Sequence, residues 1–361
     1  MTWLYQRSIE IILQNQSSTG AYIACPNFPI YYYCWYRDGS FTAYAMDLVG
    51  KHESASAFHK WAASTINANE STVNRAISKI DAGDEIGDSD ILHTRYAVDG
   101  SFSQDEWPNF QLDGFGTWLW ALKEHSILSG QELSKEILSA VQLAAQYLSK
   151  LWKYPCFDCW EEFSEDIHTY TLGAIYAGFN ACVSLIGEQY CDVRDQVREY
   201  ILNNCVRDGK FVKYIGVNDV DGSLIGLGVP YRIVALEDPI MQRTVADIES
   251  TLRCNGGVHR YNKDTYYGGG EWLLLTAWLG WYYAKIGAVE NARIILEWIE
   301  SQANDWGWLP EQIPETLNDP SFFEVWQQRW GEIASPLLWS HAQYLILEHS
   351  LNDELKMQSF R

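Results

Sequence analysis

Long apolar runs and basic residues are both scarce in this chain of 361 residues. No apolar run reaches the roughly 18 residues that a transmembrane helix needs, so we do not expect a membrane protein. Lys and Arg number 26 against 47 Asp and Glu, which gives a formal net charge of -21. Such a surface repels nucleic acids and anionic lipids, so we expect neither as a partner. The acidity favours a neutral or cationic ligand, although it also serves solubility alone.

A disulfide framework and a signal peptide are also missing. The eight Cys residues have no regular spacing, and the N-terminal stretch contains Arg7 and Glu10 and indicates an amphipathic helix. We therefore expect a cytoplasmic protein with reduced thiols. Cys156 and Cys159 form a single C-x-x-C, but no second pair follows and His168 stands nine residues further on. A zinc site needs more ligands at suitable spacing, so we predict no metal and no cofactor.

Sustained alternation of polar and apolar residues is rare, whereas helical periodicity dominates. Hydrophobic residues make up 47% of the chain, which is enough for a large core and excludes disorder. We predict an all-α protein with few and short strands. The predicted helices span residues 2–15, 40–50, 53–69, 114–129, 134–153, 167–187, 190–205, 239–253, 271–286, 289–304 and 335–350, with a weaker one at 225–236.

The predicted connections alternate between short and long. Successive connections of antiparallel helices lie at opposite ends, so helical hairpins arranged in a ring would place every long loop around one mouth. Functional residues usually lie in such loops on a rigid scaffold. No linker divides the sequence, so we expect residues 1–361 to form a single domain. The long loops span residues 16–39, 70–113, 154–166, 206–224, 254–270 and 305–334.

These loops combine aromatic rings with charges in an unusual way. Residues 31–46 read "YYYCWYRDGSFTAYAM", in which Arg37 and Asp38 follow several rings. Glu161 directly follows a Trp in "CWEEFSED", and Glu311 follows two Trp residues and a Pro in "WGWLPEQ". Trp rings present a flat apolar face to a pyranose, and charged side chains form strong hydrogen bonds to sugar hydroxyls. This combination predicts a sugar site.

Two separated carboxylates in an aromatic pocket are typical of glycoside hydrolysis. One carboxylic acid protonates the leaving oxygen, and a second carboxylate acts on the other face of the sugar. The acid must keep its proton near neutral pH. A ring such as Trp160 excludes water and a neighbouring charge such as Glu162 opposes ionisation, and both effects raise a carboxyl pKa.

Five motifs together resemble the glucoamylase family, glycoside hydrolase family 15. They are "YYYCWYRDGSF", "FQLDGFGTWLW", "CWEEFSED", "GGVHRYNKDTYYGGGEWLLLTAWLG" and "WGWLPEQ" followed by "SPLLWSHAQYL", and they run in the family's order from about residue 20 to 345. The resemblance implies an (α/α)6 barrel and inverting hydrolysis of α-glucosides from the non-reducing end, which releases β-glucose. It implies Glu161 as general acid and Glu311 as general base, with their carboxyls about 6.5–9.5 Å apart. The predicted substrate-binding residues lie within these motifs or beside them. They are Tyr33, Trp35, Arg37, Asp38, Trp107, Asp113, Trp160, Glu162, Arg260, Tyr261 and Trp308.

Simpler interpretations of the two carboxylates stay open beside the catalytic one. Glu161 and Glu162 are also compatible with a solvated turn. Glu311, which follows Pro310, is compatible with a charge at the N-terminus of a helix.

The charged pairs likewise have structural interpretations. Arg37 and Asp38 are compatible with an ion pair, or Asp38 with the N-cap of a helix that begins near residue 40. Arg260 is compatible with a structural pair to Asp264.

The linkage that is cleaved does not follow from the sequence, because variable loops build the site for the leaving sugar. Members of the resembled family cleave starch, trehalose or dextran, and many carry extra domains for which this chain has no room. We therefore expect short oligosaccharides, with α-1,6-linked ones such as isomaltose favoured.

A non-catalytic sugar-binding module is the alternative from another class, because regulatory subunits of phosphorylase kinase contain glucoamylase-like domains. A purely structural helical ring is less compatible with charges and rings gathered in loops. The oligomeric state stays open.

Overall fold

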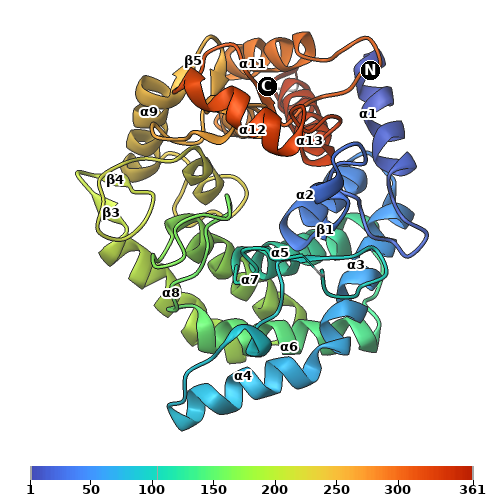
Figure 1. Ribbon diagram of the computed structural model, residues 1–361, viewed down its shortest axis with the longest axis vertical. Coiled ribbons are helices and arrows are strands. Elements are labelled where there is room, and N and C mark those ends of the chain that lie inside the picture. The colour runs from blue at the N-terminus through green and yellow to red at the C-terminus, as the bar shows by residue number, and fades with distance from the viewer. Residues whose placement is uncertain (1, 104, 360–361) are drawn as a thin grey trace. The chain divides into compact units, whose positions relative to one another are not determined.

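The computed structural model describes residues 2–103 and 105–359, and they are mostly helical (Figure 1). Their contacts divide the chain into two compact units. We call residues 16–23 and 33–205 the central unit, and residues 1–15, 24–32 and 206–361 the C-terminal unit. Each unit is described by itself. The prediction of a single domain with all long loops at one mouth stays a prediction.

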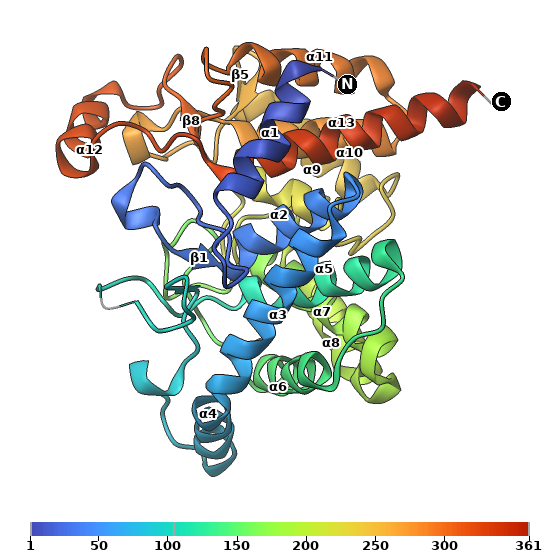
Figure 2. The same ribbon diagram turned by 90° about the vertical axis from the view of Figure 1, so that its right-hand side faces the viewer.

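The central unit is built around three neighbouring helices, in which α5 packs against both α2 and α7 (Figure 2). Arg37 on the first turn of α2 bonds Asp113 at the start of α5, and Asp47 near the end of α2 bonds His125 on α5. Helices α2 and α5 therefore run parallel. The unit's elements are β1 (Cys34–Trp35), α2 (Tyr36–Leu48), α3 (His52–Ala68), α4 (Glu70–Ala82), β2 (Arg95–Tyr96), α5 (Asp113–Ser129), α6 (Lys135–Leu151), α7 (Thr169–Ile186) and α8 (Cys191–Asn204).

Two glycines allow α5 and α7 to approach closely. A Cβ atom at Gly116 would lie 2.3 Å from the carbonyl oxygen of Ala174, and one at Gly178 would lie 2.8 Å from the Cα atom of Gly116. Any larger residue at these positions would push the helices apart. By length and composition α7 resembles a membrane span, but 67% of its window is buried and it packs against α5 and α8. It is therefore a core helix.

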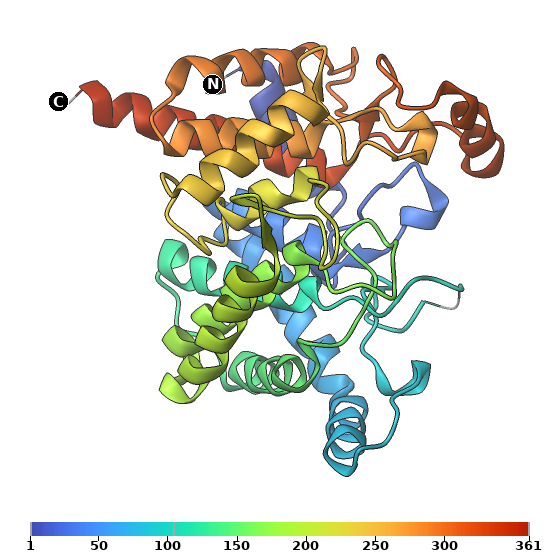
Figure 3. The ribbon, with the colours of Figure 1, turned by 90° about the vertical axis from the view of Figure 1, so that its left-hand side faces the viewer.

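The C-terminal unit packs α10 against α11 and α13, and α1 lies on α13 (Figure 2). A four-stranded antiparallel sheet, β5-β6-β7-β8, accompanies these helices. Helix α12 and the free end of α13 lie at opposite ends of this unit (Figures 2 and 3). The unit's elements are α1 (Trp3–Gln14), β3 (Val206–Arg207), β4 (Lys210–Phe211), α9 (Pro239–Leu252), β5 (Arg253–Cys254), β6 (Gly257–Val258), β7 (Glu271–Trp272), α10 (Leu273–Lys285), α11 (Val289–Ser301), β8 (Gln312–Ile313), α12 (Phe323–Trp330) and α13 (Leu338–Ser359).

The eleven periodic segments predicted as helices are helices, and the predicted strands are short, with two residues in each one named here. The weaker helix predicted at 225–236 is wrong, because the chain there forms only a short 3-10 helix over Gly222–Leu227. Gly226, Gly228 and Pro230 interrupt that segment, and proline in particular cannot continue a helix. Helices α4 and α12 lie inside predicted loops. Helix α12 buries no residue, and the three that α4 buries, Thr72, Val73 and Ala76, include only one branched aliphatic side chain.

Candidate active site

The loop before α7 holds Glu161 in a tight and strained turn. Asp158, only 3% exposed, accepts hydrogen bonds from the backbone N–H groups of Trp160 and Glu162, both at 2.9 Å. Glu161 takes a φ of 70°, and Phe163 a φ of 55°. Residues other than glycine rarely adopt such values, and when they do they cluster at functional sites. A buried carboxylate therefore organises this turn, whereas Glu161 and Glu162 themselves are half-buried, so the solvated-turn interpretation stays open.

Trp35 fixes the carboxylate of Glu161. The indole Nε1 of this buried Trp donates to Glu161 Oε1 across 2.7 Å. Because an indole nitrogen can only donate, Oε1 must act as the acceptor. A proton carried by Glu161 therefore resides on Oε2. The contact joins the first and third predicted motifs within the central unit.

Arg37 is the centre of a buried polar cluster that also contains Asp38 and Asp113. Its Nη1 atom donates to Gln111 Oε1 and to Asp113 Oδ2, both at 3.1 Å. Its Nε atom lies 3.4 Å from Asp38 Oδ2. The structural ion pair predicted as an alternative for Arg37 and Asp38 is therefore present. The N-cap alternative is wrong, because Asp38 lies inside the first turn of α2 and Trp35 occupies the cap position.

Asp38 has an unusual protonation equilibrium. Burial of this carboxyl raises its pKa to about 7, with the Glu161 and Asp113 carboxylates adding to the shift and the Arg37 guanidinium opposing it. A group that ionises near neutral pH can either donate to or accept from a sugar hydroxyl. The hydrogen bonding of this cluster therefore changes over the physiological pH range.

Tyr33 and Trp107 are brought together by Arg95, a residue that the motifs do not contain. Its guanidinium carbon lies 3.7 Å from the Trp107 ring centroid and 4.2 Å from that of Tyr33. Arg95 is fully buried and pairs with Trp35 across β1 and β2. Cation–π contacts of this kind hold rings in fixed orientations. The three predicted aromatic residues thus form one cluster around a cation.

In the C-terminal unit, the segment that carries Glu311 is held on several sides. Glu311 immediately precedes β8, which pairs with β7, so its interpretation as a charge at a helix N-terminus is wrong. Its backbone N–H donates to the Ala334 carbonyl at 2.9 Å. Leu309 donates its N–H to His341 Nε2, and His341 Nδ1 therefore donates to Ser8 Oγ. His341 is the buried hydrogen-bonding residue of the last helix, and its burial lowers its pKa to about 3.

Two tyrosines form a chain of hydroxyls that ends on Glu311. The Tyr31 hydroxyl donates to Glu311 Oε1 at 3.1 Å and lies 3.0 Å from the Tyr266 hydroxyl. Because the single Tyr31 proton points to the carboxylate, Tyr266 must be the donor to Tyr31. Hydrogen bonds donated to a carboxylate stabilise its charged form. The arrangement suits a carboxylate that acts as a base.

Arg260 forms the structural pair that the sequence allowed. Its Nε atom donates to Asp264 Oδ2 at 2.7 Å, and its Nη2 atom bonds Asp264 Oδ1. Both side chains are buried. The guanidinium also faces the Trp272 ring, with its carbon 4.9 Å from the ring centroid, and the Tyr266 ring at 5.4 Å. Arg260 therefore stiffens the surroundings of the Tyr266 hydroxyl.

Tyr261 is covered by a second cation that the sequence analysis did not identify. Lys213 Nζ lies 3.3 Å from its ring centroid and 2.9 Å from Asp221 Oδ2. Burial alone would raise the pKa of Asp221, but Lys213 and the bonds from Ser223 hold that pKa below its usual range. Trp308, by contrast, packs on the exposed Trp306, with ring centroids 5.2 Å apart.

Most of the residues missed by sequence reasoning act through partners elsewhere in the chain, whereas Asp158 organises its own turn. Tyr31 and Tyr266 stood inside quoted motifs, and their neighbourhood of rings was the only signal for them. Asp158 also lies in a site loop, one residue before the C-W-E-E motif. Nothing in the sequence points to Arg95 or Lys213.

Comparison with known proteins places these features in a family. The sequence profile of glycosyl hydrolases family 15 matches residues 2–349. An isomaltose glucohydrolase of Kribbella flavida is 38% identical over 356 residues, which cover 96% of this chain and 92% of that protein.

Solved structures agree with this result. A wild-type glycosidase superposes with a TM-score of 0.94 at 38% identity, covering 97% of this chain and 96% of that one. The glucoamylase of Hormoconis resinae, 16% identical, superposes with a TM-score of 0.73 and covers 97% of this chain and 73% of that one. The chain has the predicted all-α (α/α)6 fold of these structures. It is a glycoside hydrolase and belongs to glycosyl hydrolases family 15.

Proposed function

We propose that this protein is an inverting exo-α-glucosidase that releases β-glucose from short α-glucosides, with a preference for α-1,6 linkages. Glu161 acts as the general acid and Glu311 as the general base. The observation that carries the proposal is that each carboxylate has one oxygen held by an aromatic donor, Trp35 Nε1 in one case and the Tyr31 hydroxyl in the other. Such fixed orientation is what a positioned acid and a positioned base require.

The two steps of the reaction assign a role to each group. Glu161 transfers its Oε2 proton to the glycosidic oxygen as the bond to the anomeric carbon breaks. Glu311 removes a proton from the attacking water on the opposite face, so that the configuration inverts. Inversion requires room for that water, and a crystal structure with glucose should show the carboxyls about 6.5–9.5 Å apart. A separation near 5 Å would contradict inversion.

The other predicted residues bind the sugar in this proposal. Arg37 and Asp38 hold hydroxyls of the terminal glucose, and Trp35, Trp107 and Trp160 supply apolar faces. The remaining contacts come from side chains that line the same loops, namely Tyr33, Asp113, Glu162, Arg260, Tyr261 and Trp308. The linkage preference is supported by the 38% identity to an isomaltose glucohydrolase.

We also propose that the protein acts in the cytoplasm. All eight Cys are free thiols in the structure, and six of them are buried. Burial raises the pKa of the Cys156 thiol, which keeps that thiol protonated and makes it a poor metal ligand. Measured thiol content of protein purified without reductant tests this proposal, because oxidised pairs would indicate another compartment.

The decisive experiment follows anomeric proton signals over time while the purified protein acts on isomaltose, maltose and trehalose in separate samples. We expect β-glucose to appear first, and fastest from isomaltose. Early α-glucose would contradict inversion, and faster cleavage of trehalose would identify a trehalase. Glucose binding without turnover of any of the three would favour a binding module.

Variants then assign the roles. We expect Glu161→Gln and Glu311→Gln to lose nearly all turnover while glucose binding persists. Glu165→Gln, on the same loop as Glu161 and exposed, is the matched control and should keep full activity. Retention of most activity by Glu311→Gln would show that the base is wrongly assigned.

A further inference from the structure

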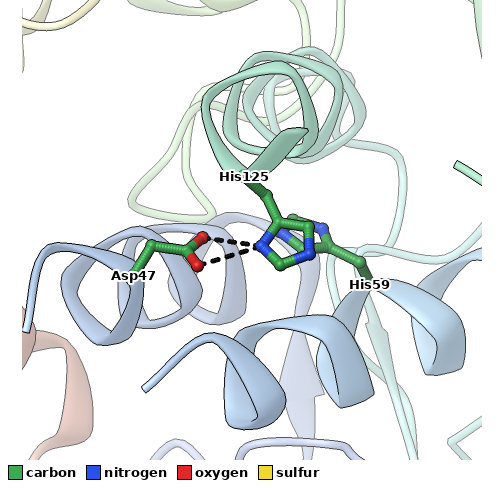
Figure 4. A group of neighbouring side chains, drawn as sticks. All are labelled: Asp47, His59 and His125. Atoms are coloured by element: carbon green, nitrogen blue, oxygen red, sulfur yellow. Dashed lines mark hydrogen bonds and ion pairs between the residues drawn. The ribbon is translucent and has the colours of Figure 1, made fainter. Parts of the chain in front are cut away.

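A buried cluster of two imidazoles and a carboxylate lies in the central unit, outside the candidate active site. Asp47 comes from α2, His59 from α3 and His125 from α5 (Figure 4). The three side chains are at most 3% exposed. Each offers one ligand atom, and these atoms all lie within 4.8 Å of one another. Two consecutive helices, α2 and α3, and the more distant α5 therefore direct metal-binding groups to one point.

His59 is the unusual member of the cluster. Its side chain is completely buried, yet neither ring nitrogen has a hydrogen-bond partner among the described residues. Buried polar atoms are nearly always paired, and an unpaired one costs about 1–3 kcal/mol. Its ring centroid lies 4.9 Å from that of His125. An imidazole nitrogen without a hydrogen-bond partner can offer its lone pair to a metal ion.

The other two members are already oriented. His125 Nδ1 lies 3.0 Å and 2.9 Å from the two oxygens of Asp47 (Figure 4). The half-buried His52 places its Nδ1 atom 2.8 Å from Asp47 Oδ1. Ligating carboxylates in metal sites are commonly held by such an outer hydrogen bond, which fixes the orientation of the ligand.

We propose that Asp47, His59 and His125 bind a divalent transition-metal ion of borderline softness, with Zn²⁺ as the type. Two imidazoles and one carboxylate are a common donor set for that ion, and a water molecule would complete a tetrahedral arrangement. Tetrahedral donors at about 2.0–2.1 Å from zinc lie about 3.3 Å from one another. The ligand atoms, now up to 4.8 Å apart, would have to move closer together when the ion binds.

The role of this metal is structural. The cluster lies nine residues beyond Asp38 on α2 and twelve beyond Asp113 on α5, which corresponds to about 14 and 18 Å along the two helices. No group of the candidate active site belongs to it. The ion would join α2, α3 and α5 behind the ends of the helices that carry Arg37 and Asp113.

The test uses full-length protein without an affinity tag, stripped with EDTA and then exchanged into chelator-free buffer. Zn²⁺ is added in excess, unbound metal is removed by gel filtration, and bound zinc is measured by atomic absorption. We expect one zinc per chain, a higher melting temperature with zinc, and a tetrahedral visible spectrum when Co²⁺ is used instead.

Variants separate this site from adventitious binding. His59→Leu fills the same space in the core with an apolar side chain that cannot bind a metal ion. Asp47→Asn keeps the volume of the carboxylate but removes its charge. Both variants should lose zinc binding. His52→Ala should weaken zinc affinity about 10–100-fold, because it acts on Asp47 and not on the ion. His349→Ala, a partly exposed His on α13, is the matched control and should bind as the wild type does.

Three results would overturn the proposal. The first is absence of zinc in the wild-type protein after loading. The second is equal binding by the wild type and by both His59→Leu and Asp47→Asn. The third is an octahedral Co²⁺ spectrum in the wild type. If His59→Leu does not fold, Asp47→Asn and the Co²⁺ spectrum still decide the question.

Discussion

Trp35 and Glu161 are joined by a hydrogen bond of 2.7 Å from the indole nitrogen to Oε1, although 126 residues separate them. We expect Trp35→Phe to keep the ring but release the carboxylate, and to lower kcat about 10–100-fold with a smaller change in KM. A positioned general acid increases the reaction rate roughly 10²–10⁴-fold, and a loss of its orientation removes part of that increase. Steady-state kinetics on the best disaccharide measure the effect.

A second tryptophan provides the control for this substitution. Trp61 is also buried in the central unit and donates its indole N–H to the Val98 carbonyl at 3.0 Å. Trp61→Phe should therefore lose stability without losing kcat. Equal kcat values for Trp35→Phe and the wild type would show that the bond does not position an acid.

Much of the fold was predictable because helices repeat on a local scale. The spacing of apolar residues predicted α6 and α11, where a single stripe is buried. It failed for α12, which buries no residue, for α4, whose buried residues include only one branched aliphatic side chain, and for residues 225–236, where hydrophobic residues are divided by Gly226 and Pro230. Periodicity reflects the burial of large apolar side chains, so a helix that buries few of them shows only a weak pattern.

The candidate site was predictable only where its residues are neighbours in sequence. Trp35, Arg37 and Asp38 form one motif and were identified together. The pairing of Tyr31 with Glu311 spans 280 residues, and no local pattern encodes it. The same holds for His59, because its relation to Asp47 and His125 exists only once three helices have packed. Contacts between residues that are distant in sequence arise only when the helices pack, so they cannot be predicted from one sequence.

The hydroxyl of Tyr31 predicts a change in the pH profile. Tyr31→Phe removes a donor to Glu311, which makes the ionised carboxylate less stable and easier to protonate. A base that protonates more easily already loses its function at a higher pH. The acidic limb of the kcat/KM profile should therefore shift to higher pH, while the maximum value of kcat/KM falls. Profiles measured between pH 4 and pH 9 check this expectation.

Two neighbouring tyrosines separate direct from indirect effects. Tyr266→Phe keeps the bond from Tyr31 to Glu311 and should give a smaller displacement of the same limb. The Tyr267 hydroxyl instead donates to the Gly331 carbonyl at 2.9 Å, so Tyr267→Phe should leave the limb in place. A profile of Tyr31→Phe that overlays the wild type would refute the assignment.

Asp38 predicts a pH-dependent affinity for glucose. Its pKa of about 7 means that the carboxyl is protonated below neutral pH and ionised above it. The ionised form accepts stronger hydrogen bonds from sugar hydroxyls, so affinity should rise as the pH passes through about 7. Calorimetric titration at several pH values measures the change. Asp38→Asn should bind glucose equally at each pH, whereas the exposed Asp84→Asn should behave as the wild type does.

The same carboxyl affects stability with a definite sign. Its pKa is raised above the value of about 3.9 expected in the unfolded chain, so the folded state binds the proton more tightly. Its contribution to stability is therefore present at acidic pH and is lost as the pH rises through about 7. Asp38→Asn should remove this dependence, and denaturant unfolding at pH 5 and pH 8 compares the two proteins. An unchanged difference between these pH values would contradict the assignment.

His341 predicts the opposite dependence in acid. Burial lowers its pKa to about 3, whereas an unfolded histidine takes up a proton near pH 6.5. Between these values the unfolded state binds more protons, so stability must fall as the pH falls, by about 1.4 kcal/mol per pH unit at most from this one group. His341→Gln cannot be protonated, so its free energy of unfolding, measured with denaturant between pH 6 and pH 4, should change less steeply with pH.

Ser8→Ala removes the acceptor of the Nδ1 proton but keeps the buried ring, so it should be less stable at every pH, while its free energy of unfolding should change with pH as steeply as that of the wild type. If His341→Gln keeps the full slope, another buried group governs the acid sensitivity, and the bond from Leu309 to His341 does not set the pH range over which the Glu311 segment stays in place.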